Sequence, residues 1–239
     1  MSIRDVKGKI IDKIKVDNVL VSVFDKFGLD DLIIDLMEIN PNVRFMSTGG
    51  TYKKIREILG DQFSDNLTAV DDYTGFPEME GGLVKTLHPK IHAGILGERN
   101  NTEHQRYLKE ELNSAVYIDM LIVNLYPFNQ VIQDDDVTFE KARGNIDIGG
   151  PGMIRGAAKN FLSCAVVTDP SDYGNLISII KSNGGCTTFE ERFNLAVKAF
   201  RATAEYDATI SDYLAKKLLM DQMDESEAIR NEYSFMEDG

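Results

Sequence analysis

The sequence predicts an α/β fold with three layers, in which a mainly parallel sheet is covered by helices on both faces. Short apolar runs rich in β-branched residues alternate with longer segments of helical periodicity, and turn residues separate them. Alternating strands and helices favour parallel strands joined by helical crossovers. With 239 residues, 43% hydrophobic and 27% charged, the chain fits one large α/β domain or two small ones.

The first third of the chain contains two predicted strand–helix pairs. Residues 1–17 mix charges with isoleucines and are expected to form an amphipathic N-terminal arm. A buried strand is predicted at 18–24, followed by a turn at 25–28. The next segment, 29–39, has the spacing of a helix with one apolar face. A second strand at 43–47 then turns into a helix that ends at Gly60.

The remaining two thirds continue this alternation after a loop-rich stretch at 71–90. We expect a polar helix near 103–112, the strongest strand at 117–125 and a helix at 149–160. A strand at 164–168 and a helix at 173–181 follow. Residues 189–219 form one long helix or two in succession. We therefore expect one domain over 18–220 and an acidic, mobile tail over 221–239.

The composition of the chain disfavours some classes of binding partner. The formal net charge of −13 disfavours nucleic acid and anionic membranes, and no apolar run is long enough to span a bilayer. The N-terminus lacks the pattern of a secretory signal, and Cys164 and Cys186 form no CxxC pair. These features predict a cytoplasmic protein. A small phosphorylated substrate remains compatible, because a local cradle of N–H groups outweighs distant charge.

Residues 47–51 read Ser-Thr-Gly-Gly-Thr between a strand and a helix. Glycines there let the backbone approach an anion, and a helix N-terminus offers free N–H groups. The pattern fits a phosphate cradle, and it fits equally a glycine-rich turn with capping residues.

The loop before residue 93 carries Lys85, Thr86, His88 and His92. A loop lysine is ordinarily a solvated charge, so these residues alone do not establish a site. His88 and His92 could lie one helical turn apart as metal ligands, but no third ligand has a useful spacing. We therefore predict no metal.

Three further groups follow predicted strands or lie on the helix at 149–160. Asn124 and Tyr126 end the strongest strand, where they either face a ligand or pack in the core. Asp147 precedes a glycine pair. Lys159 follows three small residues, where crowding would lower the pKa of an acid–base lysine. Lys159 also suits a helix C-terminus, where a cation pairs with the helix dipole.

The ordered motifs SVFDKFG, STGGT, DYTGFPE, VKTLHPKIHAGIL, NLYPF, NIDIGGP, AAKN and DPSDY resemble the IMP cyclohydrolase domain of the AICAR transformylase/IMP cyclohydrolase family. The resemblance runs from about Val19 to about Leu219. It implies a methylglyoxal-synthase-like fold with additional C-terminal helices. It also implies dehydrative ring closure of formamidoimidazole-carboxamide ribotide (FAICAR) to inosine monophosphate (IMP), with no cofactor.

The resemblance assigns roles to particular positions. Lys159 matches the family's acid–base lysine, while Lys85, Tyr126 and Asp147 match the other catalytic groups. The nucleotide-binding positions that it implies are Ser22, Asp25, Lys26, Ser47, Thr48, Gly49, Gly50, Thr51, Thr86, Val123, Asn124 and Ile148.

Five positions depart from the family pattern. Phenylalanines stand at 24 and 27 where the family usually has hydroxyl side chains, and Leu83 replaces an arginine. Gly152 and Phe161 replace a threonine and a histidine. The losses at Phe24 and Leu83 remove polar groups from the expected nucleotide contacts.

Two alternative functions share the fold: a methylglyoxal-synthase-type lyase, and a non-catalytic regulatory module that binds a nucleotide. The lyase does not account for KTLHP, NLYPF or AAKN, and the substitutions at Phe24 and Leu83 favour the module. The resemblance also implies a homodimer. It leaves room for a separate AICAR transformylase, because the family's second half has no counterpart in this chain, which by itself is not expected to transfer formyl groups.

Overall fold

A computed structural model describes residues 10–77, 79–80, 83–134, 136–221 and 233. The chain divides into two compact units. The first comprises Met1–Leu125 and Gly149–Phe200, and the second comprises Tyr126–Ile148 and Arg201–Gly239.

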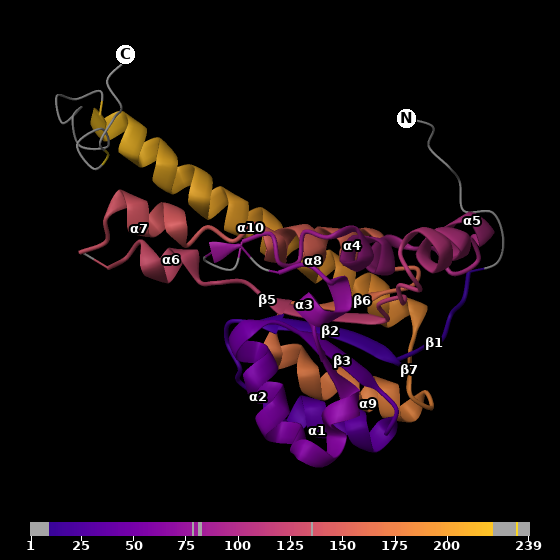
Figure 1. Cartoon of the computed structure of the whole chain (residues 1–239). Helices are drawn as coiled ribbons and strands as arrows, with labels where there is room; N and C mark the ends of the chain where they lie inside the picture. Colours follow the sequence, from indigo (N-terminus) through magenta and orange to yellow (C-terminus); the bar gives the residue numbers. More distant parts are fainter. Residues whose placement is uncertain (1–9, 78, 81–82, 135, 222–232, 234–239) are drawn as a thin grey trace. The chain divides into compact units, whose positions relative to one another are not determined.

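The first unit is built on a five-stranded parallel sheet with the strand order β4-β3-β2-β5-β6 (Figure 1). The strands are β2 (Asn18–Val23), β3 (Arg44–Ser47), β4 (Leu67–Ala69), β5 (Met120–Asn124) and β6 (Ala165–Val167). Central strand β2 places Val21 beside Ser47 of β3 and Val23 beside Asn124 of β5. Their carboxyl ends therefore lie together at one edge of the sheet.

Helices cover both faces of this sheet, which confirms the predicted three-layer α/β fold (Figure 1). One face packs against α1 (Leu29–Ile39), α2 (Gly49–Leu59) and α9 (Tyr173–Ser182). The other packs against α4 (Pro89–Leu96), α8 (Gly149–Lys159) and the first part of α10 (Phe189–Asp221). Side chains alternate along each strand, so Val19 and Val21 join one core and Leu20 joins the other.

Residues 14–17 belong to the fold of the first unit, although the sequence predicted an arm. Strand β1 (Ile14–Lys15) pairs antiparallel with β7 (Cys186–Thr187), and the Ile14 and Val16 side chains are buried. The remaining short elements of this unit are η1 (Asp61–Asn66), α3 (Val70–Thr74), α5 (Thr102–Arg106), the π-turn η3 (Tyr107–Glu111) and η4 (Pro170–Asp172). The expected helix at 103–112 thus consists of α5 and the π-turn.

Arg192 of α10 is fully buried and fastens the N-terminal segment to the unit. Its guanidinium donates hydrogen bonds to the backbone carbonyls of Ile11, Asp12, Phe161, Leu162 and Thr187, at 2.9–3.2 Å. Burial lowers the pKa of Arg192 to about 10, so the guanidinium remains charged near neutral pH. Hydrogen bonds from the charged guanidinium to five carbonyls offset the free energy that its removal from water costs.

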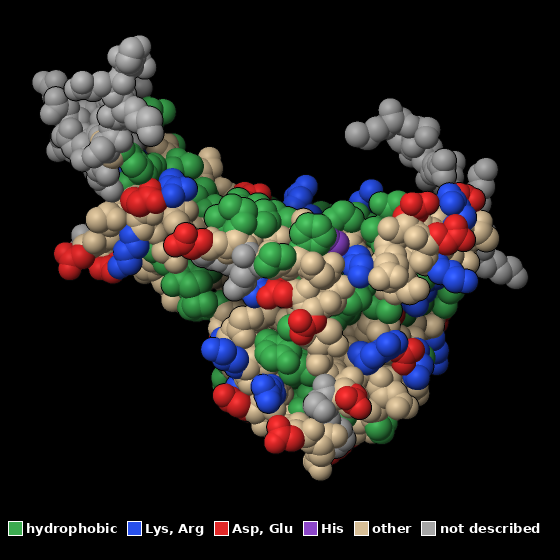
Figure 2. Space-filling view, viewed as in Figure 1, with side chains coloured by type: hydrophobic (Ala, Val, Ile, Leu, Met, Phe, Trp, Pro, Cys, Tyr) green, Lys and Arg blue, Asp and Glu red, His purple; other side chains and the backbone are tan. Residues whose placement is uncertain are grey.

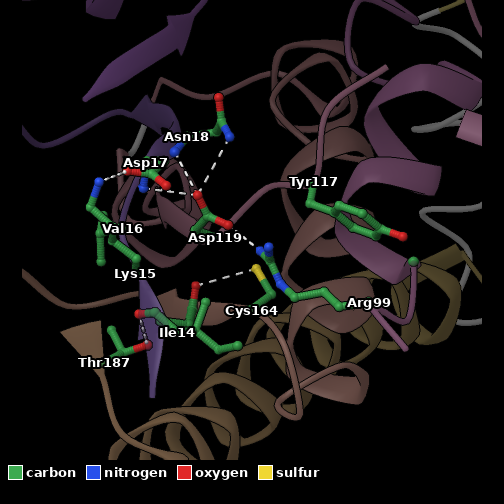
Figure 3. A network of polar contacts seen from close by, with 12 residues as sticks. Ile14, Lys15, Val16, Asp17, Asn18, Arg99, Tyr117, Asp119, Cys164 and Thr187 are labelled. Carbon is green, nitrogen blue, oxygen red and sulfur yellow. Dashed lines mark hydrogen bonds and ion pairs between the residues drawn. The ribbon is translucent and has the colours of Figure 1, made fainter. Parts of the chain in front are cut away.

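Asp119 joins the amino ends of β2 and β5 (Figure 3). Its Oδ2 accepts hydrogen bonds from the backbone N–H groups of Asp17 at 2.9 Å and Asn18 at 2.6 Å. Its Oδ1 pairs with Arg99, whose guanidinium lies over the Tyr117 ring. Burial raises the pKa of Asp119, while Arg99 and the two N–H groups oppose that shift.

The second unit contains α6 (Phe128–Val131), α7 (Phe139–Gly144) and the second part of α10. An aromatic cluster joins them: Phe128 lies edge-on to Tyr206 and Tyr213, and Phe139 stacks on Tyr213. The segment predicted as one helix or two is a single helix of 33 residues. Nearly all of the expected tail, 222–232 and 234–239, lies outside the described residues. No described helix is long and apolar enough to cross a membrane.

Candidate active site

The candidate site lies where parallel strands β2, β3 and β5 end. In open parallel sheets, ligands bind at the carboxyl edge, where the connecting loops meet. Three predicted segments leave the sheet there: the loop after Val23, the turn after Ser47 and the segment after Asn124. The structure thus brings together the predicted contacts Ser22, Asp25, Lys26, Ser47–Thr51, Val123 and Asn124.

Residues 48–51 form the turn and helix start that the sequence predicted as a phosphate cradle, and two of the predicted hydroxyls serve the fold. Gly49 has φ +48°, a conformation that favours glycine, and a Cβ at Gly49 or Gly50 would meet no described atom within 4 Å. The space beside these two glycines is therefore open, and the first N–H groups of a helix have no partner within it, which is compatible with anion binding. Ser47 and Thr51, by contrast, are buried and donate to the carbonyls of Val21 and Val23.

Asn124 shapes the neighbouring loop. Its Oδ1 accepts hydrogen bonds from the N–H groups of Phe24 at 2.7 Å and Asp25 at 2.9 Å, and its Nδ2 donates to the Asp25 carbonyl. All three bonds use backbone atoms of the loop. Asn124 therefore holds the segment that carries Asp25 and Lys26 in place. This structural role is separate from the ligand contact that the sequence predicted for it.

Lys85 forms an ion pair that sequence reasoning missed. Its Nζ lies 3.5 Å from Asp71 Oδ2, and its side chain is only 13% exposed. Asp71 lies in α3, directly after edge strand β4, so the pair is close to the end of β3 and its cradle. The other Asp71 oxygen, Oδ1, is buried without a hydrogen-bond partner among the described residues. The DYTGFPE motif marked this region of the sequence, but nothing in it singled out Asp71.

The loop that leads to Lys85 is strained and leads into a well-capped helix. Val84 has φ +56°, which is unusual for a β-branched residue and costs about 1–3 kcal/mol. Thr86 is buried. His88 caps α4 by accepting a hydrogen bond from the Lys90 N–H. Burial lowers the pKa of His92, while a hydrogen bond with the Thr86 backbone opposes that shift. Both histidines thus have structural roles.

Tyr126, Asp147 and Ile148 belong to the second unit. Tyr126 is half-buried, and its carbonyl accepts a hydrogen bond from the Phe128 N–H at 2.7 Å. The backbone N–H of Asp147 donates to the Tyr206 hydroxyl at 2.8 Å. Ile148 is 62% exposed. Tyr206, which fixes the Asp147 backbone, is a second residue that carried no signal in the sequence.

Lys159 is not at the carboxyl edge of the sheet. It is the last residue of α8, an 11-residue helix that spans about 16 Å and leads back to the start of β6. There it is exposed and lines a cavity of about 520 Å³ together with His104 and Tyr107. Within the first unit, α8 thus separates Lys159 from the phosphate cradle.

The departures from the family pattern leave apolar side chains exposed in the first unit. Phe24 is 48% exposed and Leu83 is 58% exposed, and Phe27 and Phe76 are also exposed. Figure 2 shows hydrophobic side chains at the surface of the face that carries α4. A Cβ added at Gly152 would lie 3.9 Å from the His92 and Leu87 side chains, which is ordinary van der Waals contact.

Comparisons with known proteins bear on the fold and the family of the chain. The sequence profile of the MGS-like domain matches residues 28–152, and that of the AICARFT/IMPCHase bienzyme matches residues 157–236. A bifunctional purine biosynthesis protein PurH from Chlorobaculum parvum is 45% identical over 201 residues. That match covers 84% of this chain but 37% of the relative, so the chain spans about a third of that protein's length.

A solved structure described as the crystal structure of ForH superposes with a TM-score of 0.67. It is 32% identical, and the match covers 82% of this chain and 97% of that one. The resemblance drawn from the motifs is thereby confirmed. The chain belongs to the family of MGS-like domains and is related to the bifunctional purine biosynthesis proteins that carry an AICARFT/IMPCHase pair.

Proposed function

We propose that the protein is an IMP cyclohydrolase, which closes the second purine ring by dehydrating FAICAR to IMP. The observation that carries this proposal is the open N-terminus of α2 at Gly49 and Gly50, at the same sheet edge as the Lys85–Asp71 pair. A ribotide phosphate fits that helix end, because free N–H groups and the helix dipole both favour an anion. The relationship to bifunctional purine biosynthesis proteins supplies the substrate class.

The reaction requires proton transfers but no redox step. The carboxamide nitrogen bonds to the formyl carbon and gives up one proton, and the formamido nitrogen gives up a second as it forms a double bond to that carbon. The formyl oxygen leaves with both protons as water. Asp147 suits the acceptance of a proton from the weak amide nucleophile. Lys85 and Tyr126 suit the stabilisation and protonation of the departing oxygen. Holding the two reacting groups together supplies much of the acceleration, because the reaction is intramolecular.

Lys159 receives no step in this mechanism, because α8 separates it from the cradle in the first unit. The family resemblance nevertheless assigns acid–base chemistry to Lys159. The structural placement and the family assignment therefore predict different activities for a Lys159 variant. A Lys159→Ala variant that retains turnover supports the structural assignment. A variant that binds IMP but no longer turns over FAICAR supports the family assignment.

The test of the function is direct. The purified chain is mixed with FAICAR, and IMP formation is followed by absorbance for the wild type and for Lys85→Met and Asp147→Asn. We expect turnover in the wild type and a loss of about 100-fold or more in each variant. Lys109→Met, an exposed lysine of the π-turn, is the matched control. No turnover by the wild type would overturn the proposal.

A second candidate is a regulatory module that binds a purine nucleotide without turnover. The exposed Phe24 and Leu83 favour it, because polar family residues are lost at both positions. Calorimetric binding of IMP together with absent turnover would select this module. Release of methylglyoxal from dihydroxyacetone phosphate would instead indicate the lyase.

We further propose that the enzyme acts in the cytoplasm as a homodimer. It would receive its formylated substrate from a separate AICAR transformylase. Both proposals follow from the relationship to the bifunctional proteins, in which the profile names the two activities together. The chain alone is then expected to form no IMP from the unformylated ribotide and formyl-tetrahydrofolate.

A further inference from the structure

Tyr206 contacts both segments of the second unit that carry proposed catalytic groups. Its hydroxyl accepts the hydrogen bond from the Asp147 backbone N–H at 2.8 Å. Its ring lies edge-on to Phe128 with centroids 6.4 Å apart, and Phe128 follows Tyr126 by two positions. Tyr206 comes from α10, some 60 positions further along the chain.

Both contacts are held rigidly. Tyr206 is 8% exposed and Phe128 is 1% exposed, so neither ring can turn without disrupting the packing around it. Phe128 also lies edge-on to Tyr213, about two helical turns after Tyr206 in α10, with the ring centroids 5.7 Å apart. The Phe128 N–H in turn donates to the Tyr126 carbonyl at 2.7 Å. A continuous series of contacts therefore runs from Asp147 through Tyr206 and Phe128 to the Tyr126 backbone.

The Tyr206 hydroxyl supplies a hydrogen-bond acceptor for the Asp147 N–H, which the aromatic ring alone does not. The Asp147 N–H lies in the irregular segment between α7 and α8, and a partly buried donor without an acceptor costs about 1–3 kcal/mol. Burial raises the pKa of Tyr206, so its hydroxyl remains protonated, and the oxygen accepts this bond through a lone pair. Removal of the hydroxyl takes this acceptor away from the Asp147 N–H while the packing of the ring remains.

We propose that Tyr206 is a positioning residue, which sets the Asp147 carboxylate relative to Tyr126 for ring closure. This inference rests on the proposed cyclohydrolase function. It assigns α10 a part in the chemistry, although the apolar pattern of that helix indicates only packing. Misplacement of a reacting group by about 1 Å costs up to about 100-fold in rate, which sets the scale of the expected effect.

The test is Tyr206→Phe, which keeps the ring and removes only the hydroxyl. We expect kcat for FAICAR to fall about 10- to 100-fold, with KM changed less than about threefold, because the phosphate cradle is untouched. The matched control is Tyr213→Phe, which changes another buried hydroxyl of the same cluster. It should leave kcat within about twofold of the wild type. Equal losses in both variants would overturn the inference, because they would indicate general loosening of the cluster.

A double-mutant cycle separates positioning from stability. If Tyr206 acts through Asp147, Tyr206→Phe has no further effect on turnover in an Asp147→Asn background. Full additivity of the two losses overturns the inference. Wild-type turnover with an unchanged Tyr206→Phe variant overturns the positioning role alone. Absent wild-type turnover overturns the cyclohydrolase function, and the positioning role with it.

Discussion

The carboxylate of Asp71 governs where Lys85 points. With a side chain only 13% exposed, Lys85 has few alternative positions, and its Nζ is directed to Asp71 Oδ2. We expect Asp71→Asn to lower kcat for FAICAR about tenfold, because an amide holds the ammonium less firmly. The exposed neighbour Asp72 provides the control, as Asp72→Asn. Equal activity of the two variants, measured as initial rates of IMP formation, would show that the ion pair has no role in positioning.

His92 should make stability depend on pH. Burial lowers its pKa below the ordinary value of 6.5, so the unfolded chain binds this proton more readily than the folded one. The stabilisation is therefore fully present above pH 6.5 and is lost as the pH falls through the folded pKa. Urea unfolding from pH 7.5 to pH 5 should show a steeper loss for the wild type than for His92→Gln. Parallel curves would contradict this assignment.

Residue roles were predictable where a local motif carries the chemistry. The glycines of STGGT indicated an open helix N-terminus, which the structure has at Gly49 and Gly50. The inward orientation of Ser47 and Thr51 depends on β2, more than 20 positions away, so no local pattern revealed it. The same applies to Asp71 and Tyr206, whose partners are distant in the sequence.

At the scale of elements, α10 provides the strongest test of stability through Arg192. Replacement by methionine leaves five carbonyls without their donor, which should reduce the free energy of unfolding by about 3–5 kcal/mol. Arg192→Lys keeps the charge but lacks the planar fork, so an intermediate loss is expected. Exposed Arg201 serves as the control, and Arg201→Met should cost less than about 0.5 kcal/mol. Chemical denaturation measures all three variants.

Elements with a long periodic pattern were predictable, and very short ones were not. Leu29–Ile39 shows its buried stripe in the sequence, and the structure has a helix over the same residues. Strands β1 and β7 have two residues each, so neither has enough length to show alternation. They exist because each pairs with the other across more than 170 positions. Such short strands form only through contacts with distant residues, and a short stretch of sequence gives no information about those contacts.

At the scale of the whole molecule, the proposed homodimer has a candidate interface on the first part of α10. Phe193, Val197 and Phe200 follow helical spacing and are 47%, 41% and 41% exposed. Phe193 also packs against Phe161 and Phe189 in an aromatic cluster. An apolar stripe of this kind marks a surface that another protein covers. We expect light scattering to give a dimer for the wild type and a monomer for Val197→Glu, and a monomeric wild type would refute the assembly.

The two-unit organisation could not be predicted from composition. The second unit takes one segment from the middle of the chain and another from the end, Tyr126–Ile148 and Arg201–Gly239. The acidic run near the end of the sequence begins at 221, so it does not mark the boundary at Arg201. The parallel sheet and its two helical layers, by contrast, follow from the alternation of strands and helices, which repeats along most of the chain.

The burial of Arg192 also bears on the order in which the protein can assemble during its synthesis. The carbonyls of Ile11 and Asp12 are made before their donor, which lies about 180 positions later in the chain. At about 5–20 residues per second, the ribosome supplies that donor roughly 10–40 s after the acceptors. The segment that contains Ile11 and Asp12 therefore cannot form its hydrogen bonds to Arg192 until α10 emerges. We expect chaperones to bind the nascent chain during this interval.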